Sequence, residues 1–140
     1  LKKQNVRIVD HVNSWQEAVY AATDNLVEQG FVTGNYPRAI IEMTERYGAY
    51  YVLAPNVALI HARPEDGVIK KQLAVTMLLQ PIYFKNKEFP AKLLITLAAE
   101  NSKDHIESLQ QIGELLMDEK RLERVLNIKD EDVLFEEFVR

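Results

Sequence analysis

Cysteine is absent from the 140 residues of the chain. This absence excludes disulfide bonds, metal sites with thiolate ligands and catalysis by a cysteine nucleophile, and it is typical of proteins in a reducing cytoplasm. No apolar run approaches the roughly 20 residues that a membrane-spanning helix needs. Residues 1–13 are mixed and polar, unlike a secretory signal peptide. We therefore expect a cytoplasmic protein that does not insert into a membrane.

Positive charge and the common catalytic motifs are also scarce. The formal net charge is −4 and the isoelectric point is about 5.4, whereas proteins that bind nucleic acid carry a basic surface. The three histidines are scattered and lack the spacing of a zinc site. No glycine-rich phosphate loop or serine-hydrolase motif is present. We therefore predict no metal, no cofactor and no direct contact with nucleic acid.

What the chain does contain is the apolar content of one globular domain. Apolar residues make up 47% and charged residues 27% of the chain, and its length suits one core. The sequence shows no internal repeat, low-complexity segment or linker. The prediction is a single domain over residues 1–140.

The spacing of apolar residues predicts helices and strands in a mixed order. Five helices are predicted: one from a cap at Ser14 to a stop at Gly30, one over 36–47 after a cap at Asn35, one from a cap at Ser102 to about Met117, and two short ones opened by Asp118 and Asp130. Strands are predicted at 6–9, 50–53, 57–61, 73–80 and 92–99, with a short piece at 82–84. Near-continuous apolar strands are usually buried on both faces. We therefore predict an α/β fold, a mixed sheet with helices on both faces.

The stretch APNVALIHARPEDGV at residues 54–68 ends an apolar run in a histidine, His61. In open sheets, ligands bind in crevices beyond the carboxyl ends of the strands. His61 takes such a position, and the guanidinium of Arg63 suits a phosphate or a carboxylate. A structural role, in which His61 pairs with Glu65 or Asp66, stays open from the spacing alone.

His105 begins the helix that follows the predicted strand at 92–99. It shares an apolar stripe with Leu109, Ile112 and Leu116. Its ring is therefore expected to face inward, at a helix end where free N–H groups favour anions. A half-buried structural histidine is the alternative. His11 lies in a polar stretch, and we expect it to be a surface residue.

His61 and His105 could act together if the strands at 57–61 and 92–99 are neighbours in the sheet, because both imidazoles then reach one cleft. Imidazole is a competent nucleophile with a pKa near neutrality. A phosphoryl group on it adds a charge of roughly −1.5 to −2, by analogy with other phosphorylated residues. This charge needs donors such as Arg63, His105 and backbone amides. The residues therefore favour a phosphohistidine site.

The stretch GAYYVLAPNVALIHARPEDGV at 48–68 resembles the mannitol/fructose-type enzyme IIA family of the phosphoenolpyruvate-dependent sugar phosphotransferase system. NSWQEAV at 13–19 resembles the start of the family's first helix, and AENSKDHIESLQQIGELL at 99–116 resembles the segment with its second histidine. The pattern A-P-x-x-A-x-x-H-A-R-P-E-D-G-V is closest to the ascorbate-like branch, and Ile60 stands where the family usually has proline. The resemblance covers nearly the whole chain and implies a mixed sheet of about five strands between helices.

The resemblance also implies a function. His61 would accept a phosphoryl group from the phosphocarrier protein HPr and pass it to the cysteine of an enzyme IIB partner, for sugar uptake with a membrane enzyme IIC. His105 would hydrogen-bond this site. The missing cysteine agrees, because in this pathway the cysteine belongs to the partner. The sugar and the oligomeric state are left open, and Nε2 is the nitrogen that we expect to be phosphorylated.

Two further functions stay open. Similar domains occur at the C-terminal end of sugar-responsive transcription regulators and antiterminators, where phosphorylation of the histidine sets activity and no sugar is handled. Leu1 is not a start methionine, which keeps such a regulatory domain open. The third function is an interaction domain that has lost the chemistry, and it predicts no phosphohistidine.

Overall fold

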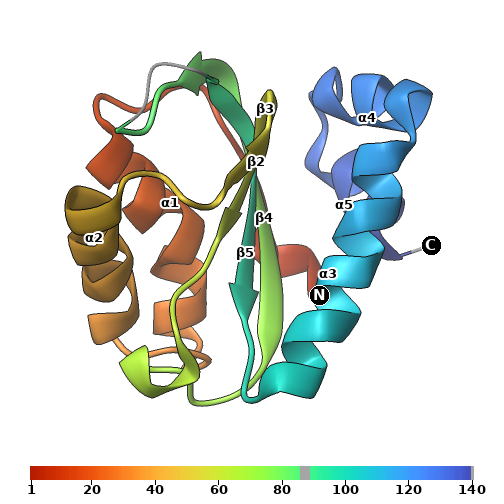
Figure 1. The fold of residues 1–140 in the computed structure, drawn as a ribbon. Helices are drawn as coiled ribbons and strands as arrows, with labels where there is room; N and C mark the ends of the chain where they lie inside the picture. The colour runs from red at the N-terminus through yellow and green to blue at the C-terminus, as the bar shows by residue number, and fades with distance from the viewer. Residues whose placement is uncertain (86–88, 140) are drawn as a thin grey trace.

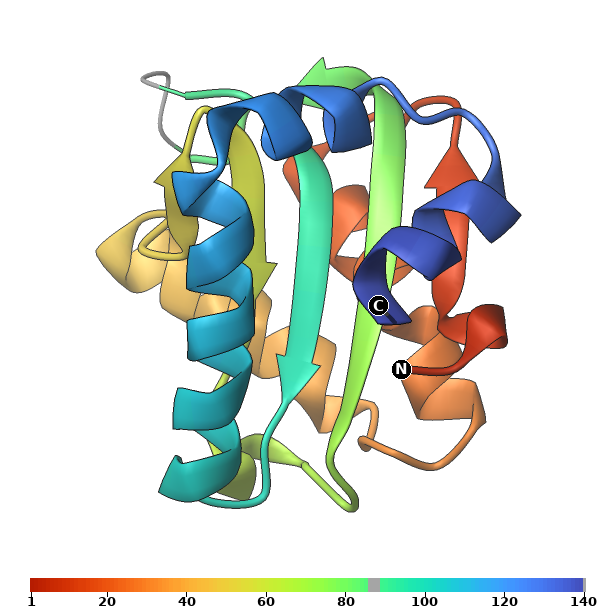
Figure 2. The same ribbon diagram turned by 90° about the vertical axis from the view of Figure 1, so that its right-hand side faces the viewer.

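The fold is a five-stranded sheet with strand order β1-β4-β5-β3-β2 (Figures 1 and 2). The computed structural model describes residues 1–85 and 89–139. The strands are β1 (Val6–Val9), β2 (Val52–Ala54), β3 (Asn56–Ile60), β4 (Gln72–Ile82) and β5 (Ala91–Ala98). β1 pairs with β4 and β3 pairs with β5 in parallel, whereas β4–β5 and β2–β3 are antiparallel. The predicted mixed sheet is therefore confirmed.

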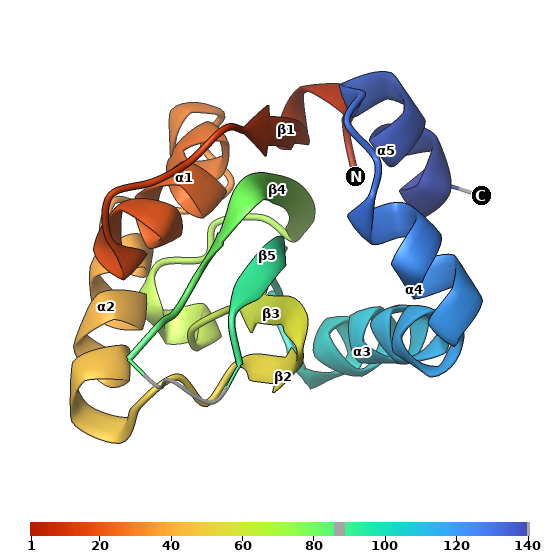
Figure 3. The ribbon, with the colours of Figure 1, turned by 90° about the horizontal axis from the view of Figure 1, so that it is seen from above.

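Helices cover both faces of this sheet (Figure 3). Helices α1 (Trp15–Glu28) and α2 (Asn35–Tyr47) lie on one face. Helices α3 (Ser102–Met117), α4 (Glu119–Leu126) and α5 (Glu131–Val139) lie on the other. Successive strand residues point to opposite faces, so Leu94 joins the core under α1 and α2 while its neighbours Leu93 and Ile95 join the core under α3–α5. This double burial is why β4 and β5 read as continuous apolar runs.

Several predicted boundaries are displaced by one or two residues. Asn101, not Ser102, caps α3, because its side-chain oxygen accepts the N–H of Asp104 at 3.0 Å. Asn35 is the first residue of α2 and Gly34 is its N-cap, and the side-chain N–H₂ of Asn35 donates to the carbonyl of Asp66. Strand β2 begins at Val52, two residues later than predicted, and the short piece predicted at 82–84 contributes only Ile82, at the end of β4. The caps at Ser14, Asp118 and Asp130 are confirmed.

A turn of 3₁₀ helix, Pro64–Asp66, follows β3 and shapes the loop after His61. Gly67 ends this turn with φ at +131°, a conformation that favours glycine. A Cβ at Gly67 would overlap the hydroxyl oxygen of Thr33, whose N–H donates to the Gly67 carbonyl at 2.8 Å. The loop is thus held against the start of α2. None of the helices among the described residues has both the length and the apolar character needed to cross a membrane.

Candidate functional site

The site lies at the edge of the sheet where the parallel strands β3 and β5 both end (Figure 2). His61 follows the last residue of β3, and three residues connect β5 to α3, which carries His105 in its first turn. The imidazole centroids of His61 and His105 are 5.6 Å apart, and the two rings are tilted by 56°. The structure thus brings the two predicted histidines together because their strands are neighbours.

A pocket of about 180 Å³ opens between these histidines. Its walls come from the loop after β3, the end of β5 and the first turn of α3, and they include Ala62, Pro64, Leu97, Asn101 and Ser102. Since Asn101 caps the helix, the hydroxyl of Ser102 is not used for that purpose. The pocket therefore offers a ligand two imidazoles and a polar helix start in an otherwise apolar setting. No group of three or more His, Asp or Glu side chains within residues 1–85 and 89–139 is arranged to hold a metal ion.

The hydrogen bond of His61 determines its tautomer. Nδ1 of the ring lies 2.8 Å from the carbonyl oxygen of Leu59. A carbonyl oxygen can only accept, so Nδ1 carries the proton and Nε2 keeps its lone pair. Nε2 is therefore the nucleophilic nitrogen of this residue.

Burial keeps the His61 ring neutral. It lowers the pKa of His61, because a protonated ring loses hydration in this half-buried position. The hydrogen bond to Leu59 opposes this shift, and the neighbouring His105 adds to it. A lowered pKa leaves the ring uncharged at neutral pH, which is the state that can attack an electrophile.

Two tyrosines that the sequence placed only in apolar patterns hold the backbone of the site. The hydroxyl of Tyr36 is fully buried, accepts the N–H of Ala62 at 3.0 Å and donates to the carbonyl of Leu97 at 2.6 Å. It joins the residue after His61 to the end of β5. Burial raises the pKa of Tyr36 far above its ordinary value, so its hydroxyl stays protonated. The hydroxyl of Tyr50 donates to the carbonyl of His61 at 2.9 Å.

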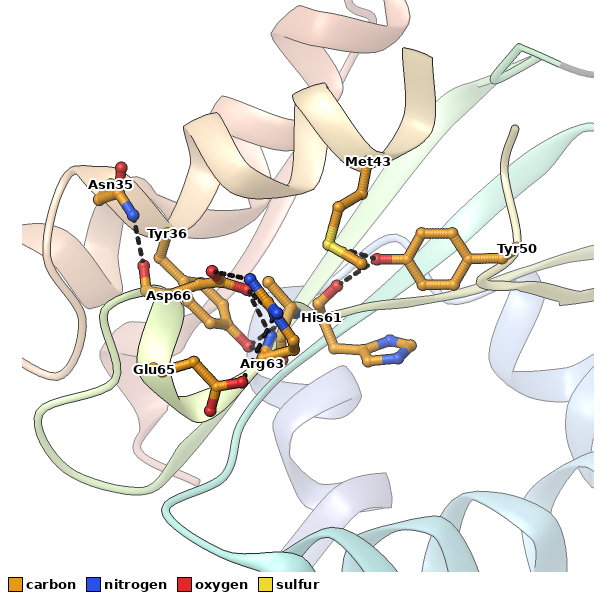
Figure 4. Close-up of polar contacts among 9 residues, drawn as sticks. Asn35, Tyr36, Met43, Tyr50, His61, Arg63, Glu65 and Asp66 are labelled. Carbon is orange, nitrogen blue, oxygen red and sulfur yellow. Dashed lines mark hydrogen bonds and ion pairs between the residues drawn. The ribbon is translucent and has the colours of Figure 1, made fainter. Parts of the chain in front are cut away.

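Arg63 lies outside the histidine pocket. Its Nε and Nη2 donate to the two carboxylate oxygens of Asp66 at 3.1 and 3.0 Å, and Glu65 lies 3.5 Å from Nε. Figure 4 shows the His61 ring pointing away from this guanidinium. Arg63 and Asp66 line a separate pocket of about 240 Å³ beside α2. The structure therefore does not bring Arg63 to the histidines, and the acids proposed as alternative partners of His61 bind Arg63 instead.

The pairing of Arg63 and Asp66 also lowers the pKa of Asp66, chiefly through the hydrogen bonds from the guanidinium. The carboxylate additionally accepts the backbone N–H of Arg63 at 3.0 Å.

His11, by contrast, is a surface residue, as its polar surroundings predicted. Its Nδ1 lies 3.1 Å from Asp10, and both side chains are exposed.

Comparison with known proteins identifies relatives of the whole chain. Residues 1–140 match the family model described as "Phosphoenolpyruvate-dependent sugar phosphotransferase system, EIIA 2". The mannitol-specific cryptic phosphotransferase enzyme IIA component of Escherichia coli K12 is 37% identical over 132 residues, which are 94% of this chain and 90% of the relative. The ascorbate-specific EIIA component of Shigella boydii is 36% identical over 126 residues, 89% of this chain and 82% of the relative.

Solved structures share the fold. The solution structure of the cryptic mannitol-specific enzyme IIA from E. coli superposes with a TM-score of 0.91 at 36% identity, covering 99% of this chain and 93% of that one. A complex of the mannitol enzyme IIA with phosphorylated enzyme IIB from E. coli contains the same fold, with a TM-score of 0.84 at 23% identity, and the match covers 99% of this chain and 96% of that one.

Proposed function

Because the chain belongs to the EIIA 2 family of the phosphoenolpyruvate-dependent sugar phosphotransferase system, we propose that it relays a phosphoryl group through Nε2 of His61. The relatives are named phosphotransferases, and this chain is a phosphotransferase component of the same kind. The observation that carries the assignment to His61 is its hydrogen bond to Leu59, which leaves the lone pair of Nε2 free beside His105.

The transfer is a nucleophilic displacement at phosphorus. The lone pair of Nε2 forms a bond to the phosphorus atom, while the bond between phosphorus and the donor breaks and its electron pair stays with the donor. Nδ1 keeps its proton throughout. The carbonyl of Leu59 therefore stabilises the positive charge that develops on the imidazole during the transfer. In a second displacement, the acceptor nucleophile forms a bond to phosphorus while the bond between Nε2 and phosphorus breaks, and the electron pair of that bond returns to Nε2.

A phosphoryl group on His61 brings roughly two negative charges to the pocket. His105 is the proposed hydrogen-bond donor to it, since its ring stands next to that of His61. The N–H and the hydroxyl of Ser102, at the start of α3, are further donors at the pocket wall. Arg63 stays a predicted phosphate ligand, and that role requires its guanidinium to leave Asp66.

The partners follow from the family. We expect HPr to donate the phosphoryl group and the cysteine of an enzyme IIB to accept it, with a membrane enzyme IIC moving the sugar. The complex of a related enzyme IIA fold with phosphorylated enzyme IIB supports the acceptor. We expect residues 1–140 to act as one domain in the cytoplasm, without direct contact with nucleic acid.

A phosphorylation assay with phosphoenolpyruvate, enzyme I and HPr tests this function. The wild-type chain and a His11→Ala control are expected to take up label, because the side chain of His11 is exposed and its ring contacts Asp10 and no residue of the pocket. His61→Ala is expected to take up none, and His105→Ala to react more slowly. Label that survives in His61→Ala would contradict the proposal.

A further inference from the structure

Tyr50 makes two separate contacts with His61. It lies between α2 and β2, outside both elements, and its hydroxyl donates to the main-chain carbonyl of His61 at 2.9 Å. Its ring stands edge-on to the imidazole, with centroids 5.4 Å apart and planes at 81°. Figure 4 shows the Tyr50 hydroxyl between the sulfur of Met43 and the main-chain carbonyl of His61. One side chain thus contacts both the backbone and the ring of the phosphoryl acceptor.

Tyr50 is itself held in place by its neighbours. Its ring packs edge-on against that of Tyr51, with centroids 4.9 Å apart. Tyr51 is fully buried, shares a hydrogen bond of 2.7 Å with Thr44 of α2 and packs against Phe84. The sulfur of Met43, also on α2, lies 3.9 Å from the Tyr50 hydroxyl. The ring of Tyr50 is therefore supported by the core under α2, although 39% of the residue is exposed.

Phosphoryl transfer depends on the direction of the Nε2 lone pair, since the attacking atom must lie in line with the bond that breaks. The hydrogen bond to Leu59 restrains one edge of the imidazole, and Tyr36 holds the N–H of Ala62, but neither contact holds the main-chain carbonyl of His61. We propose that Tyr50 is a positioning residue for the transfer, which holds the main chain and one side of the ring so that Nε2 is presented to the donor. This inference rests on the proposed function of His61.

Three variants separate the two contacts of Tyr50. Tyr50→Phe keeps the ring and removes the hydrogen bond, whereas Tyr50→Ala removes both, and Tyr50→Leu fills part of the space if the alanine variant does not fold. Tyr20→Ala is the matched control, because Tyr20 has a similar exposure of 41% but lies on α1.

The first readout is the pKa of His61, measured by NMR titration of the ring without any phosphoryl donor. Burial is the main reason why this pKa lies below 6.5. Removing the Tyr50 ring admits water, so Tyr50→Ala is expected to raise the pKa toward 6.5. Tyr50→Phe and Tyr20→Ala are expected to leave it near the wild-type value.

The second readout is the rate of phosphoryl transfer from phosphorylated HPr in a single turnover, measured at increasing donor concentration. A misplaced nucleophile costs on the order of a hundredfold in the maximal rate, which is the loss expected for Tyr50→Ala. One lost hydrogen bond costs about tenfold or less, which is the loss expected for Tyr50→Phe. Rescue of most of the rate by phenylalanine would support a role for the ring.

Two results would overturn the inference. The first is an unchanged His61 pKa and maximal rate in Tyr50→Ala. The second is a loss confined to the donor concentration at half-maximal rate, which would make Tyr50 a docking contact. If the wild-type chain takes up no label, the proposed function of His61 fails and the inference fails with it. A labelled wild type with unaffected Tyr50 variants overturns the inference alone.

Discussion

The hydroxyl of Tyr36 offers a sharp test of how the site is built. Tyr36→Phe preserves the fully buried ring and removes one oxygen atom, which joins Ala62 to Leu97. A buried polar group that loses its partner costs about 1–3 kcal/mol in the free energy of unfolding. The carbonyl of Leu97 lies in the buried end of β5, whereas Ala62 is half-buried and its N–H is closer to water. We therefore expect a loss of about 2–3 kcal/mol, the upper part of the range for one buried group, because the Leu97 carbonyl loses this partner away from water.

Tyr51→Phe is the control for this variant. Its hydroxyl shares a hydrogen bond with Thr44, whose own hydroxyl also donates to the carbonyl of Ile40 and so keeps a partner in the variant. One hydrogen bond without an orphaned backbone group is worth about 1 kcal/mol. Equilibrium unfolding in urea measures both variants. If Tyr36→Phe is no more destabilising than Tyr51→Phe, Tyr36 is not the tie between the His61 loop and β5.

Three further predictions concern the pH dependence of stability, Gly67 in the loop after His61, and the ion pairs between α4 and α5. The pKa of His61 is lower in the folded chain than its value of about 6.5 in the unfolded chain, so the unfolded chain binds more protons below pH 6.5. The contribution of His61 to the free energy of unfolding is therefore lost as the pH falls from about 6.5 to the folded pKa. Urea unfolding at a series of pH values should show this decrease in the wild type and not in His61→Gln. Gly67→Ala should destabilise the protein by about 1–3 kcal/mol in thermal unfolding, because it combines a positive φ with overlap on Thr33; an unchanged melting temperature would contradict this. Glu137→Gln should cost about 1–3 kcal/mol in urea unfolding, since this buried carboxylate lies 3.1 Å from Arg124 and 3.6 Å from Arg121; a neutral effect would show that the cluster adds no net stability.

The meeting of His61 and His105 could be predicted from the sequence because both residues lie at the ends of elements with a clear apolar pattern. His61 ends an apolar strand and His105 opens an amphipathic helix, so neighbouring parallel strands were enough to bring them together. The roles of Tyr36 and Tyr50 were not predicted, because each residue acts through its hydroxyl on a distant backbone carbonyl. The carbonyl is 61 residues away for Tyr36 and 11 residues away for Tyr50. A pattern of apolar residues reports which face of an element is buried, but it does not report where a terminal oxygen reaches.

The predicted cap of α3 was wrong because two neighbouring residues are both suited to this position. Asn101 and Ser102 are both good capping residues, and the extended backbone at Asn101 decides between them. Arg63 has the right donors for a phosphate, but in this structure the guanidinium binds the carboxylate of Asp66, three residues further along the chain. The turn of 3₁₀ helix between them sets this pairing, and the spacing of charged residues alone does not predict such a turn.

Identification of the phosphorylated nitrogen tests the central claim most directly. Protein labelled with ¹⁵N in its histidine rings, phosphorylated by enzyme I, HPr and phosphoenolpyruvate, reports the site through the ring nitrogen shifts and the coupling to phosphorus. The hydrogen bond between Nδ1 of His61 and Leu59 predicts a single phosphoryl group on Nε2 of His61, with Nδ1 still protonated. A phosphoryl group on Nδ1, or on His105 or His11, would contradict this account.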